Sequence, residues 1–225
     1  MSPLPPRFFP DGPLARLEQA VAADDAPLVA RLLAAGVDVN ARGRHGVTLL
    51  MSAVDRQSAR AVHALLAAHA DPNLVAADGQ GPVVLAARNA QAMPHGAAIL
   101  QAVLAAGGDP DAREANREPV LMRFVDRQDC AGIAALKSFG ADLDILSKNG
   151  IPVIMEAALA RDWDVVWCLI DLGARYDYGS QSDLWSLPIN LDDDVPGQGS
   201  IVYPFKLRVW QFLKDRGIAV RPMRN

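Results

Sequence analysis

The stretch Thr48-Leu-Leu-Met-Ser-Ala-Val-Asp-Arg-Gln57 has three variants further along the chain. They are Pro82-Val-Val-Leu-Ala-Ala-Arg-Asn-Ala-Gln91, Pro119-Val-Leu-Met-Arg-Phe-Val-Asp-Arg-Gln128 and Pro152-Val-Ile-Met-Glu-Ala-Ala-Leu-Ala-Arg161. A Thr hydroxyl can accept a hydrogen bond from an otherwise unpaired N–H group at a helix start. A Pro at the first helical position lacks only a donor that would be unpaired anyway. Aligned on its Thr or Pro, each stretch therefore predicts the start of a short helix.

Each stretch is followed by a second helical segment and then by a turn that contains Asp. The turns end at Asn40, Asn73, Asp111, Asp144 and Asp177, which are 33, 38, 33 and 33 residues apart. Self-similarity at such a period is typical of stacked repeats, in which each helix pair buries its apolar face against the next pair.

A unit of turn, helix, turn and helix in 33 residues resembles the ankyrin repeat. Gly46-Val47-Thr48-Leu49-Leu50 is similar to the family's Gly-x-Thr-Pro-Leu entry into the first helix. The resemblance covers about residues 13–177, and a weaker similarity extends to residue 217. It implies an all-α fold, an ankyrin-repeat solenoid of about five helix-pair repeats with an irregular C-terminal capping repeat. The expected domains are a Pro-rich N-terminal tail (1–12), the repeats (13–181) and a cap with an expanded loop (182–225).

Glycine recurs where each second helix must stop, at Gly36, Gly107, Gly140 and Gly173. A helix commonly ends on a residue in the left-handed region, where a side chain beyond glycine is strained. His69 replaces glycine in one repeat, so we expect that turn to be strained or to use another geometry.

Departures from the repeat mark further features. The 38-residue spacing places extra residues at 91–96, which form either a tolerated surface loop or an enlarged rim that touches a partner.

Phe8 and Phe9 are too apolar for a free tail, and we expect them to fold back over the first repeat, which starts at Pro13. The segment 188–204 is expected to be an expanded loop between two helices of the cap.

Composition limits the classes of function. Of 225 residues, 51% are hydrophobic and only 6% aromatic, which favours a folded helical chain. With 22 Lys and Arg against 26 Asp and Glu, the net charge is −4, which disfavours nucleic-acid binding as the main function. No apolar run approaches the ~20 residues of a membrane helix. Cys130 and Cys168 match no metal-binding spacing and form no framework of several disulfides, so we expect two small buried residues.

No set of residues typical of an enzyme is present. His63 and His69 are six residues apart, which is not the spacing of a metal-binding pair on a helix. Asp192–Asp194 is interpreted as a solvated acidic loop; a partner-facing loop and a metal site are the alternatives. We expect no catalytic activity, cofactor or metal. An enzyme would require a site in the expanded loop, with Trp185 and Tyr203 nearby.

In ankyrin proteins, partners are recognised by the tips of the turns and by outward positions of the first helices. Carried over position by position, the resemblance implies partner-binding roles for Arg44, His45, Asp55, Arg56, Asp78, Asn89, Asn116, Glu118, Asp126, Arg127, Lys148, Arg161 and Asp162. The alternative is that adjacent surface charges merely pair with one another, which contributes ~0–1 kcal/mol. Trp163 and Trp185 are added as candidate interface anchors, although Trp163, Trp167 and Trp210 could equally be core residues.

The segment Phe8-Phe9-Pro10-Asp11-Gly12-Pro13-Leu14 and the following repeats resemble short bacterial ankyrin proteins encoded beside secreted toxins. Among these are immunity partners of type VI secretion lipase effectors. The resemblance implies a non-catalytic protein-binding module, monomeric when unbound, that neutralises a cognate toxin. A general scaffold or stress-linked adaptor is the alternative. The start lacks the pattern of a signal peptide, yet it is Pro-rich like a tether left after a leader is removed. The resemblance favours the periplasm if Met1 replaces a leader; otherwise the cytoplasm is expected.

Overall fold

The computed structural model describes residues 8–9, 11–178, 187, 191 and 203–220. In this part of the chain all regular secondary structure is helical, with eleven α-helices, one 3₁₀ turn (η1, Arg44–Gly46) and isolated β-bridges such as that between Leu146 and Pro152. The predicted all-α class is therefore confirmed. The chain divides into two compact units, Met1–Asn116 (unit 1) and Arg117–Asn225 (unit 2), which are described separately.

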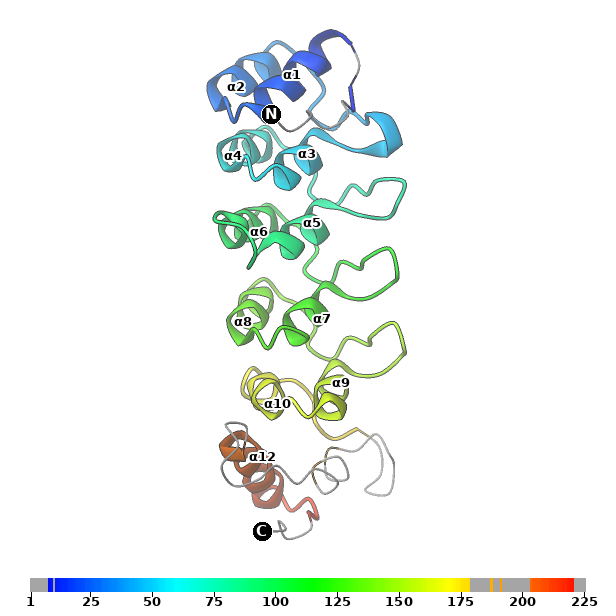
Figure 1. Ribbon diagram of the computed structural model, residues 1–225, viewed down its shortest axis with the longest axis vertical. Coiled ribbons are helices and arrows are strands. Elements are labelled where there is room, and N and C mark those ends of the chain that lie inside the picture. Colours follow the sequence, from blue (N-terminus) through cyan, green and yellow to red (C-terminus); the bar gives the residue numbers. More distant parts are fainter. Residues whose placement is uncertain (1–7, 10, 179–186, 188–190, 192–202, 221–225) are drawn as a thin grey trace. The chain divides into compact units, whose positions relative to one another are not determined.

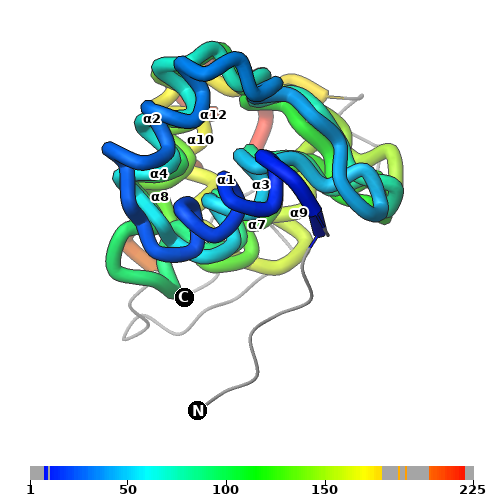
Figure 2. The backbone as a smooth tube through the Cα atoms, turned by 90° about the horizontal axis from the view of Figure 1, so that it is seen from above, coloured from blue at the N-terminus to red at the C-terminus, as the bar shows by residue number. Residues whose placement is uncertain are grey.

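Unit 1 consists of three helix pairs (Figure 1). The pairs are α1 (Gly12–Ala22) with α2 (Ala26–Ala34), α3 (Leu49–Asp55) with α4 (Ala59–Ala67), and α5 (Pro82–Asn89) with α6 (Gly96–Ala105). The first helices contact one another in the order α1, α3, α5, and the second helices in the order α2, α4, α6. The long loops between pairs extend from the side of the first helices, and they superimpose when unit 1 is viewed along the stack (Figure 2).

Helix starts in unit 1 follow the sequence signals, with one shift. The Thr48 hydroxyl accepts a hydrogen bond from the Met51 amide at 3.3 Å, so Thr48 is the N-cap of α3. Pro82 is instead the first residue of α5, and Gly81 is its N-cap. The alignment of Pro82 with Thr48 was therefore wrong by one residue, because Pro fits the first helical position as well as a flanking one.

The apolar stripes of these helices form one core. Val29, Leu49, Val62, Leu65 and Val103 have no exposed surface. Since each helix pair covers the apolar face of the next, stability is approximately a sum over the interfaces between neighbours.

The N-terminal segment packs on the first helix pair, as predicted. Phe9 is buried, and the amides of Phe8 and Phe9 both donate to the Glu18 carboxylate at 3.2 Å. The Arg44 amide donates to the Phe8 carbonyl at 2.9 Å. The two bonds from Phe8 and Phe9 supply donors to the Glu18 carboxylate, which is only 3% exposed.

The turns after the second helices share one backbone geometry. His69 has φ 63°, in the same left-handed region as Gly36 at 88° and Gly107 at 92°. The turn with His69 is thus the strained version of the common form, which decides between the two predicted alternatives. Asn40 and Asn73 link successive turns, because their side-chain oxygens accept the amides of Asp71 and Asp109, each at 2.8 Å.

A second link joins the first two helix pairs. The Asp24 carboxylate accepts the Ala61 amide at 2.8 Å and pairs with the Arg60 guanidinium at 3.0 Å. Partial burial alone would raise the pKa of Asp24, but these hydrogen bonds and the positive charge outweigh it, so that the pKa lies below its ordinary value.

Unit 2 contains two further helix pairs and one terminal helix. They are α7 (Val120–Val125) with α8 (Cys130–Ser138), α9 (Val153–Ala160) with α10 (Trp163–Asp171), and α12 (Tyr203–Asp215). Helix α7 contacts α9, α8 contacts α10, and α10 also contacts α12. Ile133, Leu136, Val166, Leu169 and Val209 form its core.

The two cysteines of unit 2 form a disulfide, which corrects the expectation of two small buried residues. Cys130 begins α8, and Cys168 lies on α10, with the two Cα atoms 6.0 Å apart. Cys168 is buried whereas Cys130 is exposed. A separation of 38 residues gives no local signal, but stacking places the two second helices side by side.

The connection between α5 and α6 is long, as the 38-residue spacing predicted. Residues 90–95 connect α5 to α6, a longer connection than residues 56–58 between α3 and α4. Met93 in this loop is exposed. The predictions for Trp185, for Asp192–Asp194 and for most of the 188–204 loop fall outside the described residues.

Candidate functional site

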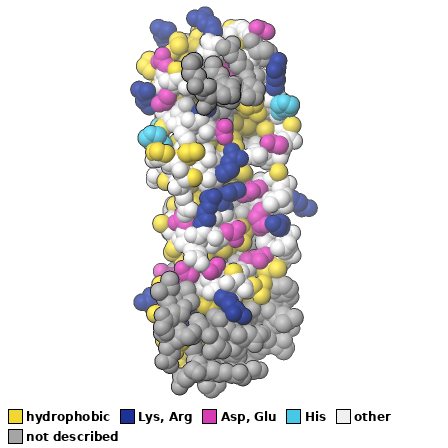
Figure 3. All heavy atoms as spheres, in the orientation of Figure 1, with side chains coloured by type: hydrophobic (Ala, Val, Ile, Leu, Met, Phe, Trp, Pro, Cys, Tyr) yellow, Lys and Arg dark blue, Asp and Glu magenta, His cyan; other side chains and the backbone are white. Residues whose placement is uncertain are grey.

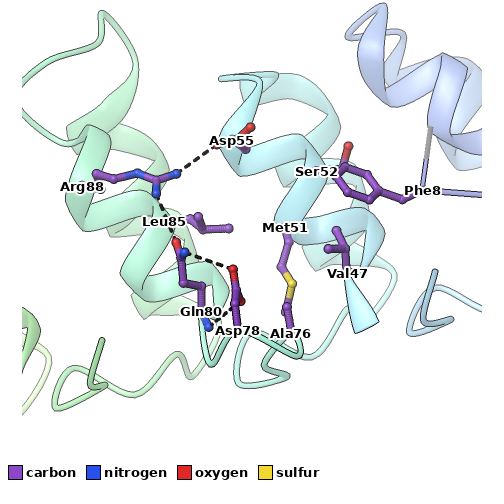
Figure 4. Close-up of a pocket in the computed structure, with 10 residues that line it drawn as sticks. All are labelled: Phe8, Val47, Met51, Ser52, Asp55, Ala76, Asp78, Gln80, Leu85 and Arg88. Carbon is purple, nitrogen blue, oxygen red and sulfur yellow. Dashed lines mark hydrogen bonds and ion pairs between the residues drawn. The ribbon is translucent and has the colours of Figure 1, made fainter. Parts of the chain in front are cut away.

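The face of unit 1 formed by the first helices and the turn loops holds a pocket of about 190 Å³ (Figure 4). It lies between α3 and α5, above the loop that leads into α5. Its walls are formed by Phe8, Val47, Met51, Ser52, Asp55, Ala76, Asp78, Gln80, Leu85 and Arg88. Two of the predicted partner-binding residues, Asp55 and Asp78, are among them.

The pocket has an apolar floor. Met51 comes from the first turn of α3, where the Thr48 cap fixes the helix start, and Leu85 occupies the following helix. Ala76 adds the loop between the pairs. All three side chains are buried. The floor is thus made by residues that also belong to the core, which holds it in a fixed shape.

The rim is polar and centred on Arg88. One guanidinium nitrogen of Arg88 pairs with the Asp55 carboxylate at 3.1 Å, and another donates to the Gln80 side-chain oxygen at 3.1 Å. The side chains of Arg88 and Asp55 are 40% and 61% exposed. In such a setting the ion pair contributes little stability, about 0–1 kcal/mol. Its main effect is to hold the guanidinium in one orientation at the mouth of the pocket.

Asp78 forms the opposite part of the rim. One of its oxygens accepts the Gln80 amide at 3.0 Å, and the other accepts the Gln80 side-chain nitrogen at 3.1 Å. Asp residues commonly fix turns through such bonds to the backbone two residues further on. Figure 4 shows Asp78 and Gln80 on the loop below the opening and Arg88 and Asp55 across it.

Unit 2 carries an acidic cluster on its corresponding loops and first helices. Glu118 pairs with Lys148 at 3.1 Å, and Glu156 accepts the Ser147 hydroxyl at 2.6 Å. Partial desolvation, followed by the negative charges of Glu118 and Glu156, raises the pKa of Asp126 above its ordinary value. An added positive charge would therefore be favoured at Asp126.

Most predicted partner-binding residues lie at the surface of their unit. Side chains of both charges are spread over the face shown in Figure 3. Arg56, Glu118 and Asp162 are half-buried, and the exposed ones are Arg44, His45, Asp55, Asp78, Asn116, Asp126, Arg127, Lys148 and Arg161.

Two predicted positions are corrected by burial. Asn89 is only 9% exposed; it is the last residue of α5, and Gly96 packs closely on its backbone. Arg88, which the sequence prediction missed, takes the position in α5 that Asp55 takes in α3. Trp163 is fully buried at the start of α10, with the Lys206 ammonium 5.9 Å from its ring, and so belongs to the core rather than to a contact surface.

In the described residues, no three or more His, Cys, Asp or Glu side chains are grouped so that they could hold a metal ion. None of the described helices is both long and apolar enough to cross a membrane.

No family model matches the chain. A segment of 60 residues, 27% of this chain, is 50% identical to a protein described as a mitochondrial disaggregase from Bos taurus. The match spans 9% of the length of that protein. It is therefore a likeness of one segment to a small part of a much larger protein.

Proposed function

We propose that the chain is an ankyrin-repeat protein. The 33-residue period, the pairs of short helices and the long loops on one side of each unit support this assignment. So do the left-handed turns at Gly36, His69 and Gly107 and the asparagine links between successive turns. These features recur at equivalent positions, as the repetition of one structural unit requires.

We further propose that it is a non-catalytic binding protein, most specifically an immunity protein that binds and neutralises a cognate secreted bacterial toxin. The observation that carries the binding function is the pocketed face of unit 1, where Asp55, Asp78 and Arg88 from successive repeats surround an apolar floor. An apolar centre with a charged rim is the usual composition of a protein-binding surface. The assignment to toxin immunity rests on the resemblance of the sequence.

The proposed location is the periplasm. The Cys130–Cys168 disulfide supports it, since disulfides persist in oxidising compartments and are rare in the cytosol. A lipase-type toxin that acts on the cell envelope would be met in that compartment.

A general adaptor that binds a host-cell protein is the second candidate. The likeness of a 60-residue segment to part of a mitochondrial disaggregase favours it, because such a segment then occurs in proteins other than toxin partners.

The test is co-purification with the product of the adjacent gene, followed by titration calorimetry and by growth of cells that express that product. Binding and restored growth are expected. Replacing Arg56 and Arg127 together by Ala should weaken binding by about 1–2 kcal/mol or more if both lie in the contact. Arg31→Ala, on the outer helix α2, is the matched control and should bind as wild type. Absence of both binding and rescue would exclude the immunity function and leave the adaptor.

A further inference from the structure

The charged groups around the pocket of unit 1 differ in their hydrogen-bond and ion-pair partners. The Arg88 guanidinium is bound on one side by Asp55 and on the other by Gln80. Arg56, which lies outside the lining, donates its Nε–H to the Ser52 hydroxyl at 3.2 Å. The guanidinium groups of Arg88 and Arg56 thus already have acceptors within the protein.

The Asp78 carboxylate has hydrogen-bond partners of a different kind. Both of its hydrogen bonds come from neutral amide donors of a single residue, Gln80. In the described part of the chain, no cation lies within ion-pair distance of its carboxylate. The group is exposed and held in place by two bonds, so that it presents a fixed negative charge at the edge of an apolar cavity.

We infer that this pocket receives a single Lys or Arg side chain of a protein partner, whose methylene stem packs on Met51, Ala76 and Leu85 while its cationic head pairs with Asp78. This inference rests on the proposed binding function and deepens it. Lys and Arg side chains bury an apolar stem while their charged head remains at the surface, which matches an apolar floor beneath a carboxylate rim.

Size and charge favour this occupant over others. A volume of about 190 Å³ suits one long side chain, because sites for drug-sized ligands are larger, about 300–1,000 Å³. The lining carries two carboxylates and one guanidinium, and that guanidinium is already neutralised by Asp55. An acidic side chain would therefore meet unfavourable charge at Asp78.

The inference can be tested without the toxin, so that its failure is distinguishable from failure of the proposed function. The full chain, with ¹³C-labelled Met and Leu methyl groups, is titrated with Nα-acetyl-arginine methylamide. The neutral norleucine and the anionic glutamate analogues are titrated in parallel. Methyl shifts should localise to Met51 and Leu85. The dissociation constant should be about fivefold lower for the arginine compound than for norleucine, the ratio expected of one partly exposed ion pair.

Two variants assign the effect to Asp78. Asp78→Asn retains an acceptor for the turn but removes the charge, and it should abolish the preference for arginine over norleucine. Asp38→Asn is the matched control, since Asp38 is exposed and accepts the Asn40 amide at 2.9 Å in the same kind of turn. Equal binding of the three compounds, stronger binding of the glutamate analogue, or a preference that survives Asp78→Asn would overturn the inference.

Discussion

Reduction of the Cys130–Cys168 disulfide should destabilise unit 2 much more than unit 1. The bond joins residues 38 positions apart in the sequence. For a loop of this length, the entropy that the cross-link removes from the unfolded chain corresponds to about 4 kcal/mol at 25 °C. The Cα separation of 6.0 Å lies within the usual range for disulfides, so the native fold accommodates the bond without displacement of α8 or α10.

The measurement is chemical denaturation with and without reductant, combined with hydrogen exchange resolved by helix. Reductant should accelerate exchange in α8 and α10 and lower the melting temperature of the chain by roughly 8–16 °C. Exchange in α1–α4 should change little, since repeats depend mainly on their neighbours.

The double variant Cys130→Ala, Cys168→Ala is the control. It should match the reduced wild type and be insensitive to reductant. The reasoning would be refuted if the chain, produced in an oxidising compartment and denatured without reductant, showed two reactive thiols. It would also be refuted if reduction left the stability of the oxidised protein unchanged.

Four further substitutions test single residues within the units. His69→Gly should stabilise the chain by about 0.5–1 kcal/mol, since relief of left-handed strain of about 1–2 kcal/mol outweighs the added freedom of the unfolded chain. Gly107→Ala, whose new methyl group would meet open space, should destabilise the chain by about 1 kcal/mol. Melting temperatures equal to that of the wild type would contradict both predictions. Asp24→Ala should cost about 1–2 kcal/mol at pH 7 because two donors on α4 lose their acceptor. Since the pKa of Asp24 is lowered in the folded state, this loss of stability should be present above the ordinary carboxyl pKa and vanish as the pH falls through the folded-state pKa. A loss of stability that does not depend on pH would indicate lost packing contacts instead. The pKa of Asp126 is raised, mainly by desolvation, so the ionised carboxylate destabilises the folded state above that pKa. Asp126→Asn should therefore raise the stability at pH 7, by about a few tenths of a kcal/mol because solvent screens the effect. In urea titrations this gain should disappear at low pH.

Much of the local structure follows from the order of residues alone. The Thr48 cap, the glycines that end the second helices and the apolar stripes between them predict short helix pairs, and the structure has them. The burial of Phe9 was also predictable, whereas for His69 the sequence left two turn geometries open and the structure has the left-handed one.

The candidate site was predictable only in part. Asp55 and Asp78 follow from their place in the repeat, and both line the pocket. Asn89 was chosen in place of Arg88 because of a one-residue ambiguity at Pro82, since such a shift changes which residue takes the position of Asp55.

The sequence by itself determined the period and the helix pairs, since these depend on contacts within about one repeat. Only the tertiary structure decided that Cys130 bonds to Cys168, that Trp163 is buried, and that Arg88 reaches back to Asp55. Each of these depends on how one repeat lies against the next. That packing brings together residues more than 30 positions apart, for which the local sequence carries no signal.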